Sequence, residues 1–195
     1  MNATTPGTGD ARRLVVGASA AFAAVLVAAS WLLLRLRGEN LAGAFDSPDL
    51  MRRIAVGVGA GVVAATVCAL VVRWLPGFAK LRRLAYHALE GIEPRWHTMV
   101  MVSLAAGLGE ELFFRGALEP AVGRWFASAA FVALHGALRI KDRGALAFAV
   151  FLFAASLGLS ALNAWKGLEA AMSAHAAYDL VMLAWLAHPR HEVTH

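Results

Sequence analysis

The chain has 195 residues, of which 59% are hydrophobic and only 16% are charged. Soluble domains are typically about 45–50% apolar and about 25% charged, so this composition indicates a membrane protein and excludes an intrinsically disordered one. A disulfide-stabilised secreted scaffold is excluded because Cys68 is the single cysteine. The net charge of +5 does not indicate nucleic-acid binding, because the basic residues form short clusters between apolar stretches.

The chain begins with a polar segment that is followed by a membrane anchor. Residues 1–13 are rich in small and polar side chains, which predicts a disordered N-terminus. Residues 14–34 form an uncharged run of 21 residues, and a membrane-spanning helix needs about 20. The run ends at Trp31 and Arg35 rather than at a small-residue cleavage site, so we interpret it as a retained anchor and not as a signal peptide.

The next two segments predict a second spanning helix and a helix at the membrane surface. Residues 54–72 form an uncharged run of 19 that contains Gly57, Gly59 and Gly61. Glycines at such spacing favour close packing between membrane helices. Residues 73–97 combine basic and aromatic side chains with a helical spacing of apolar ones, which predicts an interfacial helix.

The second half of the chain predicts four further helices and a short polar tail. These segments are about 98–117, 125–140, 144–165 and 170–187, with the tail at 188–195. No repeat or linker divides the chain, so residues 14–187 form one domain whose motif-bearing core is about 98–187. The predicted fold class is all-α, a polytopic transmembrane helical bundle of about six spans plus the interfacial helix.

The distribution of Lys and Arg over the ends of the six spans orients the bundle. Apart from Arg115, which lies inside a span, 11 basic residues fall on the side of the N-terminus and six on the opposite side. Basic residues are enriched on the cytoplasmic side of membrane proteins. We therefore expect both termini in the cytoplasm.

Ionisable side chains inside the spans are confined to three of the six predicted helices. Such groups cost several kcal/mol at a helix centre and mark functional sites by default. Glu111 and Arg115 are four residues apart, so they share a helix face and can pair. Glu110 lies about 100° round the helix from Glu111 and is free to face another group, as a general base would.

The remaining intramembrane ionisable residues are His135, His175 and Asp179, and the last two also share a helix face. At about 1.5 Å per residue, Glu110 and these three lie about 8–15 Å from the membrane face that carries residues 118–124. Because these four residues lie in one layer of the membrane, we predict that they form one site. The charge count places this site nearer the extracytoplasmic face.

Three segments carry a family resemblance. Residues 109–116 contain Glu110, Glu111 and Arg115 and resemble the E-E-x-x-x-R motif of the CAAX-protease and bacteriocin-processing (CPBP, or Abi) family. Residues 131–135, which end at His135, resemble its F-x-x-x-H motif, and residues 175–179 resemble its H-x-x-x-N/D motif. The three motifs follow the family's order on separate hydrophobic helices and cover about 70 residues.

The resemblance implies an intramembrane endopeptidase in which a glutamate activates water. It assigns Glu110 as the general base and His135 as the residue that holds or polarises the water. It implies that Glu111 and Arg115 stabilise the structure of the first motif. Peptide hydrolysis needs such a base within hydrogen-bond reach of water, and donors where oxyanion charge develops.

The resemblance gives His175 and Asp179 the positions that support the oxyanion and orient the site. Asp179 stands where the better-understood eukaryotic members have Asn, and an ionised carboxylate cannot donate a hydrogen bond. Either Asp179 is protonated, or it orients His175 and His175 donates. A third interpretation is a metal site.

No cofactor is expected, with zinc as the less favoured alternative. Two histidines and two carboxylates could form a zinc-like ligand set: Glu110, His135, His175 and Asp179. The sequence lacks the H-E-x-x-H pair of classical zinc proteases, and the resemblance favours a metal-free glutamate site.

The function predicted is cleavage of a membrane-anchored protein or peptide, with the lipid bilayer as the other partner and no nucleic acid. The Ala-, Arg- and Gly-rich composition resembles that of high-GC bacteria, so a bacterial inner membrane is the expected location. There, maturation of a peptide or of a C-terminal sorting segment is preferred over prenylated substrates, as in the small sortase-like myxosortases. The alternative is a non-catalytic scaffold or immunity protein of the same fold. A proton-relay transporter is disfavoured, because its polar residues would follow a path through the membrane.

Overall fold

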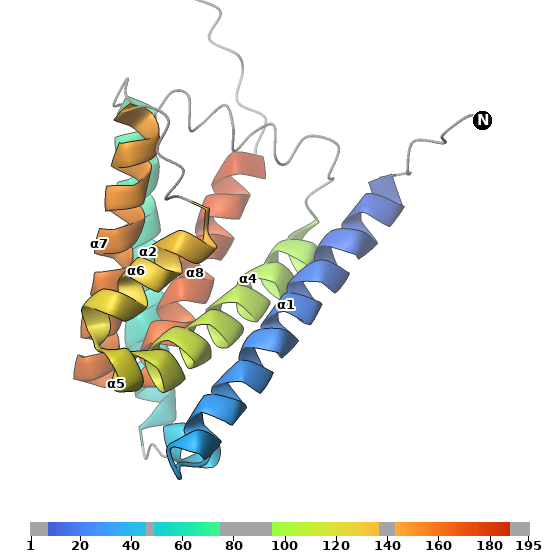
Figure 1. Cartoon of the computed structure of the whole chain (residues 1–195). Helices are drawn as coiled ribbons and strands as arrows, with labels where there is room; N and C mark the ends of the chain where they lie inside the picture. Colours follow the sequence, from blue (N-terminus) through green and yellow to red (C-terminus); the bar gives the residue numbers. More distant parts are fainter. Residues whose placement is uncertain (1–7, 46–48, 75–94, 137–142, 188–195) are drawn as a thin grey trace, which may run out of the picture.

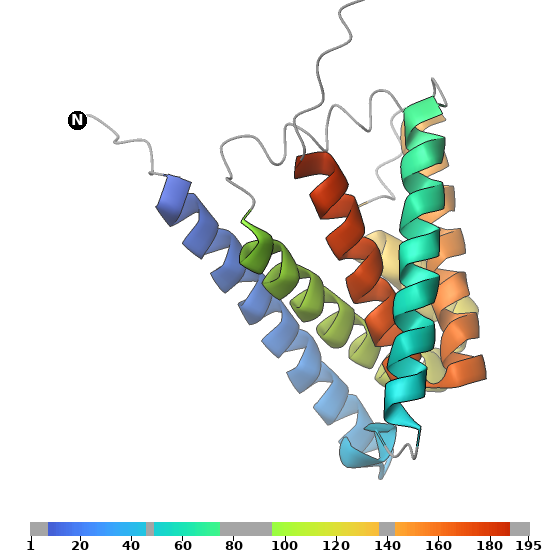
Figure 2. The same ribbon diagram turned by 180° about the vertical axis from the view of Figure 1, so that it is seen from behind.

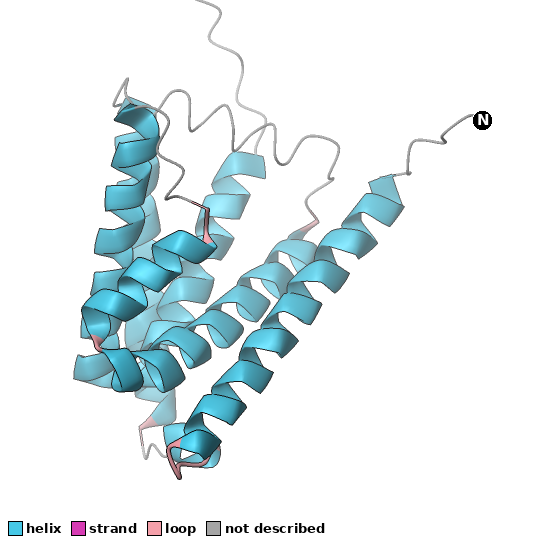
Figure 3. Ribbon diagram, viewed as in Figure 1, coloured by secondary structure: helices cyan, strands magenta, loops and turns pink. Residues whose placement is uncertain are grey.

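The computed structural model describes residues 8–45, 49–74, 95–136 and 143–187, and within these ranges every regular element is a helix (Figure 3). The long helices are α1 (Thr8–Leu36), α2 (Leu50–Trp74), α4 (Trp96–Glu111), α6 (Arg124–Leu134), α7 (Arg143–Lys166) and α8 (Leu168–Ala187). Shorter turns are η1 (Ala42–Phe45), the π-helix η3 (Leu112–Leu118) and α5 (Glu119–Val122). The predicted all-α helical bundle is confirmed.

Four of the described helices are long and apolar enough to cross a membrane, which is fewer than the six spans predicted. They are α1 from Asp10, α2, α7 from Ala145, and α8. The predicted helix at 125–140 is too long, because α6 has only 11 residues. At about 1.5 Å per residue it covers about 16 Å of a hydrocarbon core of about 30 Å. It ends before Gly136, whose positive φ of 68° stops a helix.

The fifth long helical run is continuous but charged. α4, η3 and α5 follow one another from Trp96 to Val122, and this run carries the predicted polar residues of the first motif. Residues 8–13, expected to be disordered, are the first turns of α1. Most of the predicted interfacial helix, at 75–94, and the tail at 188–195 lie outside the described residues.

Helix α8 is the central element of the bundle. It packs against α2, α4 and α7 (Figure 1, Figure 2). Its first two turns, Leu168 to His175, are almost entirely buried, whereas every residue from 176 to 187 is half-buried. The N-terminal end of α1 and the C-terminal end of α8 lie at the same end of the bundle (Figure 1). A residue on the first half of α8 is therefore held firmly from several sides.

Glycines bring α2 against α8. A Cβ atom at Gly57 would overlap the backbone of Ala170, and one at Gly61 would overlap the backbone of Ala174. Both pairs are four residues apart, so they form one contact line along the two helices. The predicted role in close packing is confirmed for these two glycines, whereas Gly59 faces open space.

The substitution Gly61→Ala tests this contact, with Gly59→Ala as its matched control. The added methyl at position 61 forces the helices apart, and overpacking of this kind costs about 1–3 kcal/mol. At position 59 the same methyl meets no atom within 4 Å, and alanine is the better helix former. We expect the free energy of unfolding in detergent micelles to fall for Gly61→Ala alone. Equal stabilities of the two variants would contradict the contact line.

Candidate active site

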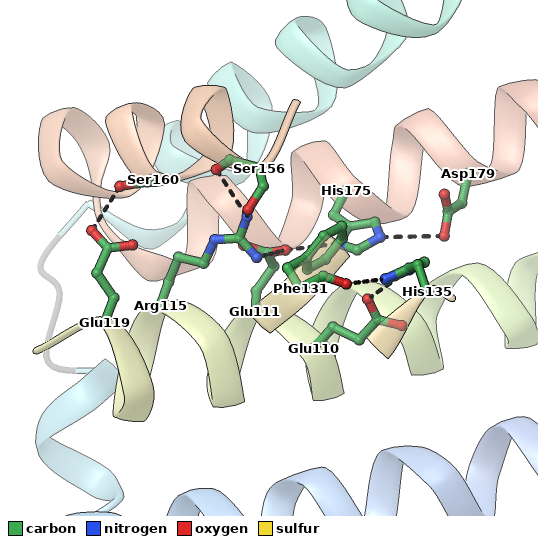
Figure 4. Close-up of polar contacts among 10 residues, drawn as sticks. All are labelled: Glu110, Glu111, Arg115, Glu119, Phe131, His135, Ser156, Ser160, His175 and Asp179. Atoms are coloured by element: carbon green, nitrogen blue, oxygen red, sulfur yellow. Dashed lines mark hydrogen bonds and ion pairs between the residues drawn. The ribbon is translucent and has the colours of Figure 1, made fainter. Parts of the chain in front are cut away.

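The structure brings all six predicted site residues into one cluster (Figure 4). Glu110 and Glu111 end α4, Arg115 lies in η3, His135 caps α6, and α8 supplies the other two. Figure 4 shows these side chains converging between the helices, with dashed lines joining them in two groups. The first group is centred on the carboxylate of Glu111 and the second on that of Glu110.

Glu111 is the most buried member of the cluster, with none of its surface exposed. Its Oε1 accepts a hydrogen bond from Arg115 Nη1 at 3.0 Å and lies 2.7 Å from His175 Nδ1. Because a carboxylate only accepts, His175 Nδ1 carries the proton of that contact. The predicted Glu111–Arg115 pair is confirmed. Its extension to His175 on a different helix was not predicted.

Arg115 is held from a second side by α7. Its Nη2 donates to the backbone carbonyl of Ser156 at 2.9 Å and to the hydroxyl of Ser156 at 2.8 Å. The guanidinium also lies 5.0 Å above the ring of Phe131, which suits a cation–π contact. Sequence reasoning missed Ser156, because α7 has no ionisable residue between its ends and small hydroxyl side chains are common in membrane helices.

The second group pairs Glu110 with His135. Glu110 Oε2 lies 3.6 Å from His135 Nε2, and this buried oxygen has no hydrogen-bond partner among the described residues. His135 Nδ1 contacts the carbonyl oxygen of Phe131 at 2.8 Å. A carbonyl only accepts, so Nδ1 carries the proton and a neutral His135 turns the lone pair of Nε2 towards Glu110.

The ring of Phe131 joins the two groups. It stacks on His135 with centroids 4.2 Å apart and an interplanar angle of 28°, and its centroid lies 6.1 Å from that of His175. One aromatic ring thus separates the cationic Arg115 from His135 and fills the space between α6 and η3. The phenylalanine of the second motif therefore contributes its backbone carbonyl and its ring.

One side of the cluster is open. The side chains of His135 and Asp179 are 31% and 29% exposed, whereas Glu111 and Arg115 are enclosed. Asp179 Oδ2 lies 3.5 Å from His175 Nε2, at the limit of a hydrogen bond. The side on which His135 and Asp179 lie is therefore the accessible side of the cluster.

The main chain changes its winding just where the cluster is anchored. Residues Leu112–Leu118 form a π-helix directly after Glu111, and a cap bond from Leu112 N–H still closes on the α-helical carbonyl of Leu108. Single π-turns are rare and occur often at functional sites. The spacing rule for an ideal α-helix predicted the Glu111–Arg115 pair but gave no sign of this wider turn.

Two alternative assignments can be compared with the geometry. Ser160 is the serine of α7 nearest in chain order to the motif of His175, and a serine protease would need it to donate to that histidine, but its hydroxyl donates to Glu119 Oε1 at 2.6 Å. Within the described ranges, no three His, Cys, Asp or Glu side chains are grouped so that they could hold a metal ion. Both ring nitrogens of His175 face carboxylates, and Nδ1 of His135 is engaged by a carbonyl.

A comparison with protein families gives one match. Residues 92–181 fit the family model described as Rce1-like, type II CAAX prenyl endopeptidase Rce1-like. The match covers just under half of the chain, and over that segment the chain is similar to the CAAX protease family. The resemblance seen in the three motifs is confirmed, and all six predicted site residues lie inside the matched range. No curated protein and no solved structure gave a significant match. With its four apolar helices, the chain is an integral membrane protein, and one segment of it is similar to CAAX proteases.

Substitution of Arg115 by methionine tests the buried pair. It leaves Glu111 as a buried charge that only His175 can offset, and breaking a buried ion pair in this way costs about 3–5 kcal/mol. We expect a loss of this size in the free energy of unfolding. The double variant Glu111→Gln/Arg115→Met removes both charges and should recover part of the loss. A single variant as stable as the wild type would show that the pair does not hold the fold.

Proposed function

We propose that this protein is an intramembrane endopeptidase that hydrolyses a peptide bond with water activated by Glu110. The observation that carries the proposal is the pairing of an unpartnered, buried carboxylate oxygen with a histidine nitrogen of fixed tautomer. Glu110 Oε2 and His135 Nε2 are two acceptors that face each other at 3.6 Å. A water molecule that donates to both would have its oxygen lone pair directed away from them.

The reaction then follows from the chemistry of these groups. Glu110 removes a proton from the water as its oxygen bonds to the carbonyl carbon of the substrate. The carbonyl oxygen becomes an oxyanion, and it is stabilised by a donor on the other side of the site. When the C–N bond breaks, Glu110 returns the proton to the leaving amine. The products are a new carboxyl end and a new amino end.

His175 is the donor that we assign to the oxyanion. Its Nδ1–H is committed to Glu111, so Nε2 faces the substrate, and it can donate there only when the ring is an imidazolium, the form that the carboxylates of Glu111 and Asp179 favour. Asp179 lies next to that nitrogen on the open side, where it orients the ring or, when protonated, donates itself. Glu111 and Arg115 hold His175 from the enclosed side. This division agrees with the roles that the resemblance implies.

The substrate that we favour is a membrane-associated protein or peptide with its scissile bond near the bilayer surface. A C-terminal sorting segment or a peptide in maturation is preferred, and a prenylated C-terminus is the other class. We place the protein in a bacterial inner membrane, with both termini cytoplasmic and the site nearer the extracytoplasmic face. No metal or other cofactor takes part in this mechanism.

The second candidate is a non-catalytic scaffold or immunity protein of the same fold. Such a protein would need the helical bundle but not the polar side chains of the cluster. Glu111, Glu119 and Glu169 also keep a buried oxygen without a partner among the described residues, but each accepts a hydrogen bond on its other oxygen. Glu110 favours the enzyme because its unpartnered oxygen faces a ring nitrogen of the partly exposed His135, and burying such a group costs free energy.

The substitution Glu110→Gln tests the proposal, and Glu119→Gln is its matched control. Both remove a carboxylate from the same helical run, but Glu119 bonds to Ser160 outside the cluster. The probes are a reporter anchored by one C-terminal membrane helix and a prenylated CAAX peptide, with products identified by mass spectrometry. We expect cleavage to fall at least about 100-fold for Glu110→Gln, in line with loss of a general base, and to persist for Glu119→Gln.

The same assay is run with and without a chelator. Unchanged cleavage in the presence of the chelator supports water activation by Glu110 alone. Loss that zinc restores would make the residues of the site metal ligands instead. Full cleavage by Glu110→Gln would refute its assignment as the base.

Asp179 gives a separate prediction. Asn keeps the shape of the side chain and can donate from its amide, so Asp179→Asn should retain cleavage within about tenfold of wild type. Asp179→Leu removes both the donor and the group that orients His175, and we expect at least a further tenfold loss in kcat. Equal kcat values for the two variants would show that Asp179 takes no part in the reaction.

A further inference from the structure

Ser156 is a buried hydroxyl in an apolar helix, and the mechanism above does not use it. Only 1% of its surface is exposed, and it lies in the middle of α7, far from the polar ends of that helix. A hydroxyl at such a position costs free energy unless it is hydrogen-bonded. Its hydroxyl oxygen and its backbone carbonyl oxygen both accept from Nη2 of Arg115.

These two bonds fix the plane of the Arg115 guanidinium. Nη1 is held by Glu111 and Nη2 by Ser156, while the rings of Phe114 and Phe131 lie 5.9 and 5.0 Å from the guanidinium carbon. Arg115 is 3% exposed, so water cannot replace a lost partner. The direction in which Nη1 points therefore depends on the bonds that Nη2 makes.

The dependence continues to the imidazole of His175. Glu111 uses one oxygen, Oε1, for both Arg115 and His175, and its Oε2 has no partner among the described side chains. A shift of the guanidinium must then move the oxygen on which His175 Nδ1 depends. Ser156, Arg115, Glu111 and His175 form one chain of contacts, which we call the relay.

We propose that Ser156 is a positioning residue, which sets the orientation of the His175 ring through Arg115 and Glu111. Helix α7 thereby takes part in the site although Ser156 contacts Arg115 on the enclosed side of the cluster, away from His135 and Asp179 (Figure 4). The effect on turnover rests on the proposed function, since it assumes that His175 supports the oxyanion. The effect on the His175 ring does not.

Ser160 provides an internal control that the chain itself supplies. It lies on the same helix four residues further on, is fully buried, and also bonds to a charged group, Oε1 of Glu119. Ser156→Ala and Ser160→Ala thus delete the same atom from the same helix face. A merely structural role would make the two variants alike.

The first measurement is NMR of protein labelled with ¹⁵N-histidine in detergent micelles, with the His175 signals identified by their loss in His175→Gln. We expect Ser156→Ala to shift the Nδ1 signal of His175 and Ser160→Ala to leave that signal in place. Ser156→Thr keeps the hydroxyl, so its His175 signal should match that of the wild type. If Ser156→Ala does not fold, Ser156→Cys replaces the hydroxyl by a weaker acceptor and serves the same comparison. An unchanged His175 signal, or an equal shift in both alanine variants, overturns the proposal.

The second measurement is kinetic and uses the probe that the wild type cleaves. We expect kcat to fall about tenfold for Ser156→Ala with KM nearly unchanged, as for a lost transition-state interaction, and Ser160→Ala to match the wild type. If Glu110→Gln is inactive while the two serine variants have equal kcat, Ser156 has no effect on turnover through His175. That result overturns the proposal for Ser156 and leaves the proposed function standing. If Glu110→Gln is fully active, the proposed function fails, and the NMR result alone decides whether Ser156 orients His175.

Discussion

One oxygen atom, Oε1 of Glu111, is the point on which the cluster depends. It accepts from Arg115 and contacts His175, and through these two residues it ties α4 to η3 and to α8. A charge that is fully buried is tolerated only when it is paired and hydrogen-bonded. Arg115, in the same helical run, pairs with this carboxylate, and Ser156 of α7 accepts a further hydrogen bond from Arg115. The electrostatic requirement of a single carboxylate therefore fixes how three segments of the chain meet.

The packing of the helices also holds His175 in contact with this oxygen of Glu111. Gly57 and Gly61 let α2 approach the backbone of α8, and Gly107 does the same for α4 beside Ala176. These contacts enclose the first half of α8, so that His175 reaches Glu111 from a rigid helix. Helix α6 ends at Leu134, and this early end places His135 opposite Glu110.

The sequence was sufficient for local features and for the composition of the site. The spacing of Glu111 and Arg115 predicted their pair, and the cost of intramembrane charges predicted that the polar residues would cluster. Contacts between helices could not be predicted in this way. Nothing in the spacing of residues relates Ser156 to Arg115, because that bond depends on how α7 packs. The end of α6 was missed because residues up to 140 have a composition that suits a helix, whereas Gly136 adopts a conformation that stops it.

The two neighbouring glutamates show how position alone divides a pair of identical groups. Glu111 points into the bundle, where both its partners are charged or can become so, and it is held in one place. Glu110, about 100° round the helix, points towards His135 and keeps an oxygen without a partner. Glu111 also keeps an oxygen without a partner among the described side chains, Oε2, but that oxygen lies in the enclosed part of the cluster, whereas the unpartnered oxygen of Glu110 faces the partly exposed His135. Under the proposed function, this difference in position makes Glu110 the reactive glutamate and Glu111 the structural one.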